Sequence, residues 1–391
     1  MKIKICHFLN RLDVGGMENG VINICNRIDR KKFKPHICCI KGKGNMSLRL
    51  KSDVNVHTFN FPEGKSIFRP LTMINFFKKE RFDIVHTHAW GACSLDGIIG
   101  ARFAGVPVVI NGEHGVFFLK KYQIASQRIL AKLCDKTLSV SLSLKKEIKL
   151  NLGIPGNKIC VIANGVDTNY FNGQYDISGV NEYILKRNIN LNNDSFLIAC
   201  VGSIKPSKNQ KILIDAIIKL KNKNLIVLFV GDGPDRKILE SYIDQNKLNE
   251  NIIFLGQRDD VHKIYSFADL LVSSSIGSHE GLSNVMLEAM ASGIPVISTE
   301  SIGARELVRE GETGFLIKSE DVGSLAEKIE RFYSDRGLLK KMGDSAQKFI
   351  KENFSIDRMI SEYEKLYLDL YNKKMNTGRK PQATGCKEQG E

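Results

Sequence analysis

The feature that most constrains this chain is the alternation of short β-rich runs with helix-length segments along almost its whole length. In the first half such runs lie at residues 2–10, 36–40, 54–61, 82–88, 106–114, 136–141 and 157–163. In the second half they lie at residues 196–204, 224–234, 251–256, 268–275, 294–301 and 314–318. Parallel strands joined by crossover helices produce this order. The sequence therefore predicts an α/β fold.

A polar, weakly patterned segment, GQYDISGVNEYILKRNINLNNDS, divides the strand series in two. A chain of 391 residues also exceeds what one core usually supports. We therefore expect a Rossmann-like domain at 1–170, a linker at 171–194 and a second doubly wound domain at 195–354. Two such domains would face a cleft at the carboxyl ends of their strands. A helix at 355–373 would cross back to the first domain, before a disordered tail at 374–391.

The positive charge of the chain is concentrated in its first half. The net charge is +14, and residues 1–170 hold 27 Lys and Arg against 12 Asp and Glu. Such a surface attracts nucleic acid, an anionic membrane or an acidic substrate. No nucleic-acid-binding motif accompanies it, so nucleic acid is not an expected partner. Basic stretches with aromatic residues at 65–81 and 115–122 fit peripheral contact with an anionic membrane, or crossover helices with a solvated lysine face.

The sequence also bears on the cellular compartment. It has no run of eighteen apolar residues, and its first strand begins at Ile3, which leaves no room for a signal peptide. Most of the nine cysteines lie within apolar patterns and none form a CxxC motif, so buried free thiols are expected. We therefore expect a cytoplasmic protein, which would work at the inner face of the cell membrane if it contacts lipid.

Two glutamates, Glu280 and Glu288, flank the start of a predicted helix in the stretch SHEGLSNVMLEAMASGIPVIST. Eight residues of helix would separate them by about 12 Å, whereas the carboxylates of glycosidases lie roughly 5 to 9.5 Å apart. A hydrolytic carboxylate pair is therefore disfavoured. The helix start would instead direct the amides of Gly281, Leu282 and Ser283 at a phosphate, with a carboxylate on each side for sugar hydroxyls. The plain structural alternative is a cap at Glu280 and a solvated position at Glu288.

Five ordered motifs together resemble those of retaining glycosyltransferase family 4, which has the GT-B fold. The donor-site signature EGLSNVMLEAMASGIPVI is followed by GARELVREGETGFLI. Before it come RLDVGGMENGVINI, then DIVHTH and NGEHG, then IANGVDTNYF, then VGSIKPSKNQKILIDA. The resemblance covers nearly the whole chain, and the first half is most similar to sugar transferases of exopolysaccharide assembly. It implies a nucleotide-sugar donor, a glycan or polyprenyl-linked acceptor, and no separate cofactor.

The resemblance also assigns roles to the two glutamates and to a glycine pair. Glu280 would receive hydroxyls of the donor sugar, and Glu288 would hold the ribose. Gly15 and Gly16 would let the backbone approach the diphosphate, because a side chain there would collide with the ligand. An ordinary tight turn is the alternative for these glycines. Their spacing is not GxGxxG and no GK[ST] follows, so dinucleotide and P-loop sites are disfavoured.

The leaving diphosphate would be neutralised by Lys208, which the resemblance places at the phosphates. The family usually has an arginine five residues before this lysine, and Ser203 stands there instead. This departure weakens the expected phosphate site unless Lys205 or Arg258 compensates. No DxD motif occurs, so a metal-independent enzyme is expected, with Lys208 and helix amides in place of a divalent ion.

Three histidines lie at or beyond the ends of predicted strands. His114, in NGEHG, stands at the family's position for a histidine near the sugar and phosphate. A lone histidine is otherwise more often structural. His86 and His88 could suggest a metal pair, but from the alternation of side chains along a strand we expect that one site does not use both.

We therefore interpret the chain as a GT-B glycosyltransferase that moves a sugar from a nucleotide diphosphate sugar to an acceptor, with retention of configuration. No carboxylate is convincingly placed as a nucleophile, so attack on the same face is the expected mechanism, with the leaving phosphate accepting the proton. A nucleotide-sugar epimerase or hydrolase on the same fold would form product without an acceptor. A catalytically weak nucleotide-sugar-binding protein would bind donor without turnover.

Overall fold

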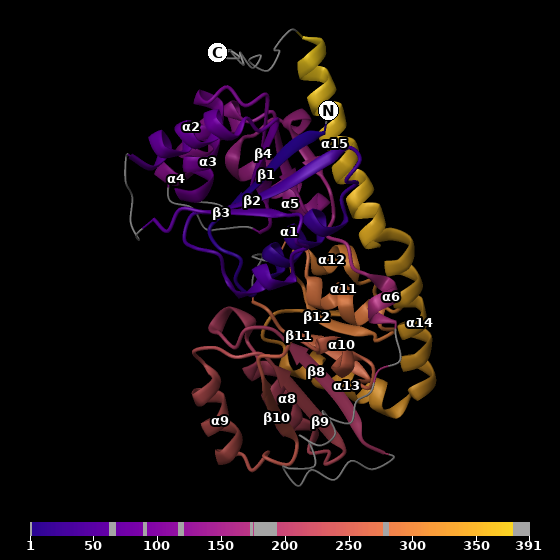
Figure 1. Ribbon diagram of the computed structural model, residues 1–391. Helices are drawn as coiled ribbons and strands as arrows, with labels where there is room; N and C mark the ends of the chain where they lie inside the picture. Colours follow the sequence, from indigo (N-terminus) through magenta and orange to yellow (C-terminus); the bar gives the residue numbers. More distant parts are fainter. Residues whose placement is uncertain are drawn as a thin grey trace, which may run out of the picture. The chain divides into compact units, whose positions relative to one another are not determined.

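The computed structural model describes residues 2–61, 68–88, 92–115, 121–172, 175, 194–276 and 281–377 (Figure 1). The chain forms two compact units. Unit 1 contains Met1–Ile162 together with Met359–Glu391, and unit 2 contains Ala163–Arg358.

Unit 1 is built on a seven-stranded parallel sheet of order β3-β2-β1-β4-β5-β6-β7. Its strands are β1 (Ile3–Leu9), β2 (Phe33–Cys39), β3 (Asn55–Thr58), β4 (Ile84–His88), β5 (Val108–Glu113), β6 (Lys136–Ser139) and β7 (Ile159–Val161). The helical segments are α1 (Gly16–Arg27), η1 (Asn45–Arg49), α2 (Phe68–Glu80), α3 (Ala92–Phe103), α4 (Lys121–Leu133), α5 (Leu142–Leu152), η2 (Gly156–Lys158) and most of α15 (Ile356–Asn376).

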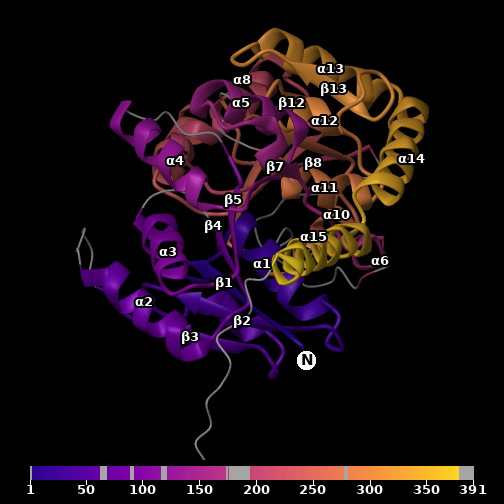
Figure 2. The ribbon, with the colours of Figure 1, turned by 90° about the horizontal axis from the view of Figure 1, so that it is seen from above.

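Both faces of this sheet are covered, so all five residues of β4 and all but one residue of β1 are buried. Helices α1 and α15 lie on one side of the sheet, and α2 and α3 lie together on the other (Figure 2). Because side chains alternate along a strand, Cys6 and Phe8 of β1 pack in the core formed with α2 and α3, while Leu9 packs in the core formed with α1. His7 therefore faces the side of α1 and α15.

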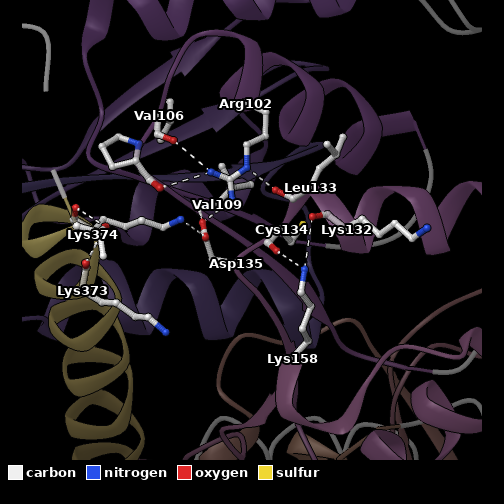
Figure 3. A network of polar contacts seen from close by, with 12 residues as sticks. Arg102, Val106, Val109, Lys132, Leu133, Cys134, Asp135, Lys158, Lys373 and Lys374 are labelled. Carbon is white, nitrogen blue, oxygen red and sulfur yellow. Dashed lines mark hydrogen bonds and ion pairs between the residues drawn. The ribbon is translucent and has the colours of Figure 1, made fainter. Parts of the chain in front are cut away.

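Polar contacts at three positions along α15 hold this helix against the rest of unit 1. The Glu364 carboxylate accepts a hydrogen bond of 2.7 Å from the backbone N–H of Asp29, and Tyr367 Oη lies 2.8 Å from Nδ1 of His86. Near the end of the helix, Lys374 Nζ lies 2.6 Å from the Asp135 carboxylate, which Arg102 also contacts (Figure 3). Burial alone would raise the pKa of Asp135, but the hydrogen bonds from Lys374, the Val109 amide and Arg102 hold this pKa below its usual value.

Unit 2 is built on a six-stranded parallel sheet of order β10-β9-β8-β11-β12-β13. Its strands are β8 (Phe196–Val201), β9 (Leu225–Val230), β10 (Ile252–Gly256), β11 (Leu270–Ser273), β12 (Val296–Thr299) and β13 (Gly314–Ile317). Its helical segments are α6 (Thr168–Phe171), η3 (Pro206–Lys208), α8 (Lys211–Leu220), α9 (Arg236–Gln245), α10 (Val261–Tyr265), α11 (Asn284–Ala291), α12 (Ala304–Leu307), α13 (Val322–Ser334) and α14 (Arg336–Asn353).

Every strand that the sequence predicts is present, and all the strand pairs are parallel. Two boundaries differ from expectation. Helix α15 continues to Asn376 and does not end at residue 373. Unit 1 ends at Ile162 and not at residue 170, because α6 packs against α10 and α11 of unit 2. Most of the expected linker and of the expected tail lies outside the described residues.

The cysteines of the described part of the chain behave as the sequence predicts. Cys6, Cys25, Cys38, Cys39, Cys134, Cys160 and Cys200 are free thiols, and only Cys160 is not fully buried. Burial raises the pKa of several of them, including that of Cys39 to about 12. These thiols therefore act as small apolar core residues.

Candidate functional site

The order of strands defines one switch point in each sheet. In unit 1 the chain reverses its direction of strand addition between β1 and β4, and in unit 2 between β8 and β11. Loops that leave the carboxyl ends of neighbouring strands at such a point diverge to opposite faces and create room for a ligand. In unit 1, Gly15, Gly16 and His114 follow β1 and β5, and His86 and His88 lie at the end of β4. The candidate residues of unit 2 follow β8, β10 and β11, so each group lies at the expected edge of its sheet.

Lys208 lies in the loop that follows β8. Its backbone carbonyl accepts a 2.8 Å hydrogen bond from Ser274 Oγ, which follows β11. The neighbouring Ser207 carbonyl accepts a 2.9 Å hydrogen bond from the amide of Ile276. These two bonds join the loops at both sides of the switch point. Gly202, with φ of 143° in a region that favours glycine, starts the loop and lies under the Lys208 side chain.

The Lys208 side chain is half-buried. Its pKa is lowered from 10.5 to about 8, mainly by burial and also by the nearby positive charge of Lys205, while Cys200 acts in the opposite direction. A cation that has lost its water and has a second cation beside it gains much from a bound anion. The two lysines therefore form a site suited to a phosphate group.

Ser203 stands where the family usually has an arginine, and its backbone makes a structural hydrogen bond. The carbonyl of Ser203 accepts a 3.0 Å hydrogen bond from Nε2 of Gln210, a buried side chain at the start of α8. Arg258, after β10, donates two hydrogen bonds of 2.7 Å to the two carboxylate oxygens of Asp260. That pairing largely neutralises the Arg258 charge, so Lys205 is the better candidate to compensate for the serine.

The start of α11 provides backbone donors at the same edge of the sheet. Ser283 is its N-cap residue, and the Ser283 side chain makes no capping hydrogen bond to the helix. Gly281 and Leu282 are buried before it, and the Leu282 carbonyl accepts a 3.3 Å hydrogen bond from Asn164. Gly303 has no room for a Cβ atom, because the backbone of Gly281 and Leu282 lies directly against it. This packing fixes the helix start in place.

Of the two candidate glutamates, only Glu288 lies within the described residues. Glu288 lies inside α11, as the sequence predicts, and is half-buried. Burial, and then the negative charge of Glu288, raise the pKa of Tyr265, which is fully buried. Glu280 lies outside the described residues. The proposed roles of both glutamates remain predictions.

The glycine pair of unit 1 lies at the start of α1. Gly15 has φ of −172°, an extended conformation that any residue can adopt, so a strained turn does not require glycine here. A Cβ atom on Gly15 would instead meet the carboxylate of Glu18, whose pKa burial raises. Gly16 is the first residue of the helix. The pair therefore opens a helix amino terminus close to the end of β1, where an anion can approach the backbone.

His114 follows β5 and is part of a group of histidines. Its Nε2 atom lies 3.3 Å from Nδ1 of His88, and Nε2 of His88 lies 2.9 Å from Nδ1 of His7. The expectation that His86 and His88 do not share one site is wrong, because residues two apart on a strand point to the same face. Both point with His7 to the side of α15, and nitrogens of the three rings lie within 4.8 Å of one another.

The sequence-based reasoning missed several polar residues near His114. His7 is the most important, and its register opposite His86 on the neighbouring strand could have been expected from the usual position of a switch point. A second group contains Glu113, whose buried carboxyl group accepts a hydrogen bond from the side-chain amide of Asn111. Thr87 Oγ1 in turn donates a hydrogen bond of 2.8 Å to Oδ1 of Asn111. Burial raises the pKa of Glu113 well above its usual value. Only the polar residues NGE at the end of a buried strand signalled this group.

Comparison with known proteins identifies the family. The family model described as Glycosyltransferase Family 4 matches residues 14–170, and the one described as Glycosyl transferases group 1 matches residues 182–349. The capsular polysaccharide biosynthesis glycosyltransferase CapM of Staphylococcus aureus is 30% identical over 355 residues, which are 86% of this chain and 90% of CapM. The chain belongs to glycosyltransferase family 4. The UDP-Gal:alpha-D-GlcNAc-diphosphoundecaprenol alpha-1,3-galactosyltransferase of Escherichia coli is another relative of this family 4 enzyme, 29% identical over 94% of this chain and 97% of the relative.

Solved structures confirm the fold of the family 4 chain. Anabaena Alr3699/HepE in complex with UDP-glucose has a TM-score of 0.81 at 21% identity, covering 94% of this chain and 100% of that protein. The protein is thus a glycosyltransferase with the GT-B fold, as the sequence motifs predict, and its relatives include enzymes of polysaccharide and lipid-linked glycan synthesis. Within the described ranges, no helix has the length and apolar character needed to cross a bilayer.

Proposed function

We propose that this glycosyltransferase transfers a hexose from a nucleotide diphosphate sugar to a lipid-linked glycan, with retention of the anomeric configuration and without a metal ion. The observation that carries the proposal is the half-buried lysine Lys208, with Lys205 beside it, at the carboxyl edge of the unit 2 sheet. A site with two cations and the backbone amides of a helix start suits two linked phosphates better than it suits a neutral sugar.

The donor would be bound by unit 2. The diphosphate would contact Lys208, Lys205 and the first amides of α11, and Glu288 would accept hydrogen bonds from the ribose hydroxyls. Glu280 would hold the transferred sugar. The solved relative with bound UDP-glucose, and the relative named for UDP-Gal, support a uridine diphosphate sugar as the first donor to test.

The chemical step would need no protein nucleophile. As the glycosidic bond to the diphosphate breaks, negative charge grows on the leaving phosphate oxygen, and Lys208 would stabilise this charge. The acceptor hydroxyl would attack from the same face and pass its proton to that oxygen. Fixed cations and amides would supply the stabilisation that a divalent ion supplies elsewhere. The relative's name specifies an alpha-1,3 linkage, which is consistent with this course for an α-linked donor.

The acceptor would be bound by unit 1, whose surface is basic. Exposed apolar residues on its helices support contact with a membrane that carries a lipid-linked acceptor. Phe68 and Leu71 of α2, Phe103 of α3, and Tyr122 and Ile129 of α4 are each more than half exposed. Lysines and arginines near such residues would favour anionic lipid. The relative named for a diphosphoundecaprenol substrate supports the same class of acceptor.

The experiment combines a donor panel with an acceptor requirement. Purified protein is incubated with radiolabelled UDP-galactose, UDP-glucose, UDP-N-acetylglucosamine and GDP-mannose, each with and without a polyprenyl diphosphate-linked sugar, and lipid-soluble label is measured. The proposal predicts lipid-soluble label from one donor only when acceptor is present, with activity retained in EDTA. Release of free sugar or of an epimer at the same rate without acceptor would contradict it.

A further inference from the structure

The histidines of unit 1 form an uninterrupted chain from the sheet interior to its carboxyl edge. The bond of 2.9 Å between His7 Nδ1 and His88 Nε2 is followed by the contact of 3.3 Å between His88 Nδ1 and His114 Nε2. Strand register explains the chain, because His7 lies opposite His86 in the β1–β4 pair and His88 lies opposite Gly112 in the β4–β5 pair. The middle ring, His88, thus uses both of its nitrogens, whereas His7 and His114 each use one nitrogen within the chain.

All members of the chain are neutral at neutral pH. Burial lowers the pKa of His7 to about 3 and that of His114 to about 4, and it lowers the pKa of His88 well below 6.5, with a further contribution from the neighbouring rings. A neutral imidazole carries one N–H and one bare nitrogen. When such rings are hydrogen-bonded in series, a ring that accepts on one nitrogen must donate from the other. The direction of the first hydrogen bond therefore decides the direction of all the others. The chain therefore has only two arrangements of its protons.

The inner end of the chain distinguishes the two arrangements. Nε2 of His7 is buried and has no hydrogen-bond partner among the described residues. If the bonds run inward, this atom carries a proton with no acceptor; if they run outward, it is a bare nitrogen. Buried N–H groups without an acceptor are rarer than buried acceptors that are not fully used. The outward direction, from His7 to His88 to His114, therefore avoids the orphaned donor.

We propose that His7 and His88 are positioning residues that hold His114 in the Nδ1–H tautomer, so that His114 offers a hydrogen-bond donor to the ligand. Nε2 of His114 faces His88, which leaves Nδ1 as the nitrogen that a ligand can meet. His114 then donates to an oxygen of the sugar nucleotide or acceptor and does not take a proton from a hydroxyl group. This ligand role rests on the proposed function, whereas the tautomer itself does not.

The same rings could also be considered for a metal ion, because their nitrogens lie within 4.8 Å of one another. The separation of 2.9 Å between His7 Nδ1 and His88 Nε2 is that of an N–H···N hydrogen bond, with a proton between the two atoms. Nδ1 of His86 lies 2.8 Å from the Tyr367 hydroxyl, which orients that ring, and Nε2 of His86 is buried with no hydrogen-bond partner among the described residues. Hydrogen bonding thus accounts for the contacts from His7 to His88 and from His88 to His114.

The test is the tautomer of His114 in the full-length protein, read from the long-range 1H–15N correlation spectrum of its imidazole ring and assigned with His114→Gln. The proposal predicts a protonated Nδ1 and a bare Nε2 in the protein as purified, without any ligand. A free histidine side chain prefers the opposite tautomer in water, so this result would need the chain. A protonated Nε2 on His114, or stoichiometric zinc bound to His7, His86 and His88 in the purified protein, would overturn the proposal.

Two substitutions at His88 and one control extend the test. In His88→Leu, which removes the donor, the Nδ1–H tautomer should no longer dominate and kcat should fall about tenfold. In His88→Asn, the amide nitrogen can take the place of Nδ1 and donate to His114, so both the tautomer and kcat should recover. His57→Phe is the control, since His57 contacts His36 at 3.1 Å in a separate pair. A His88→Leu protein with an unchanged His114 tautomer would contradict the proposal.

The two failures are distinguishable. If no donor and acceptor pair gives transfer but the His114 tautomer follows the predicted pattern, the proposed function fails and the positioning role stands. If transfer occurs and the tautomer does not depend on His88, the positioning role fails and the proposed function stands. Should His88→Leu not fold, the spectrum of the unmodified protein and that of His88→Asn still decide the question.

Discussion

The lowered pKa of Lys208 predicts a specific pH dependence for binding of a nucleoside diphosphate. In the free protein this lysine loses its charge as the pH rises through about 8, because burial and the neighbouring Lys205 lower its pKa from 10.5. The difference between these pKa values corresponds to about 3 kcal/mol, since one pKa unit is about 1.4 kcal/mol. A bound diphosphate that pairs with Lys208 would restore up to this amount of free energy to the protonated form.

The sign of the effect follows from this linkage. Below pH 8 the lysine is charged before and after binding, so affinity is independent of its titration. Above pH 8 the free protein must take up a proton to bind, and the dissociation constant should rise by about tenfold for each pH unit until the pKa of the complex is reached. The diphosphate does not add to this slope, because phosphate groups lose their last proton at about pH 6.

Isothermal titration calorimetry with UDP measures both quantities. At pH 9 the affinity should be about tenfold weaker than at pH 7.5, and titrations in buffers of different ionisation enthalpy should show the uptake of nearly one proton. Lys208→Met should bind weakly with no pH slope. Lys211→Met is the matched control, since Lys211 is paired with Asp215 outside the site and the slope should persist. A constant affinity from pH 7 to 9.5 without proton uptake would refute the reasoning.

Four further substitutions test separate parts of the structure. Glu288→Ala should weaken binding of UDP by about 1.5 to 3 kcal/mol, the value of a hydrogen bond to a charged group, whereas Glu280→Ala should lower kcat; unchanged affinity and rate in both would contradict the donor-site assignment. Ser203→Arg, measured by calorimetry with UDP, should lower affinity if Lys205 already compensates for the family's arginine, and a tighter complex would show that it does not. Asp135→Asn should lower the free energy of unfolding by about 3 kcal/mol in urea titrations, because two partly buried cations would lose their counter-charge; a change below 0.5 kcal/mol, the size of a neutral surface substitution, would contradict that role.

Local sequence patterns predicted the strands and the helix that carries Glu288 because those signals lie within a few residues of each other. The helix start at Ser283 and its stop at Gly293, which has φ of 81°, are of this kind. The end of unit 1 could not be predicted in this way. Whether residues 163–172 belong to one unit or the other depends on contacts of α6 with α10 and α11, which follow it by about ninety residues or more in sequence.

The candidate site shows the same division between local and distant information. Motifs located Lys208, His114 and the helix amides of α11, but the environment of each residue depends on other strands. Arg258 could not be recognised as paired with Asp260 from sequence alone, because neighbouring opposite charges in a loop often point apart. The histidine chain required both the order of strands in the unit 1 sheet and the period of two along β4, and the second of these was available from the sequence.

The most direct test of the account is the stereochemistry and stoichiometry of a single transfer reaction. With the donor selected from the panel and a polyprenyl diphosphate-linked acceptor, UDP release and glycosylated product are measured together, and the new linkage is analysed by NMR from its anomeric H1–H2 coupling. The account predicts one UDP released for each sugar transferred, an α linkage from an α-linked donor, and a rate that does not change in EDTA. A β linkage, release of UDP without an acceptor product, or activity that is lost in EDTA and restored by manganese would contradict it.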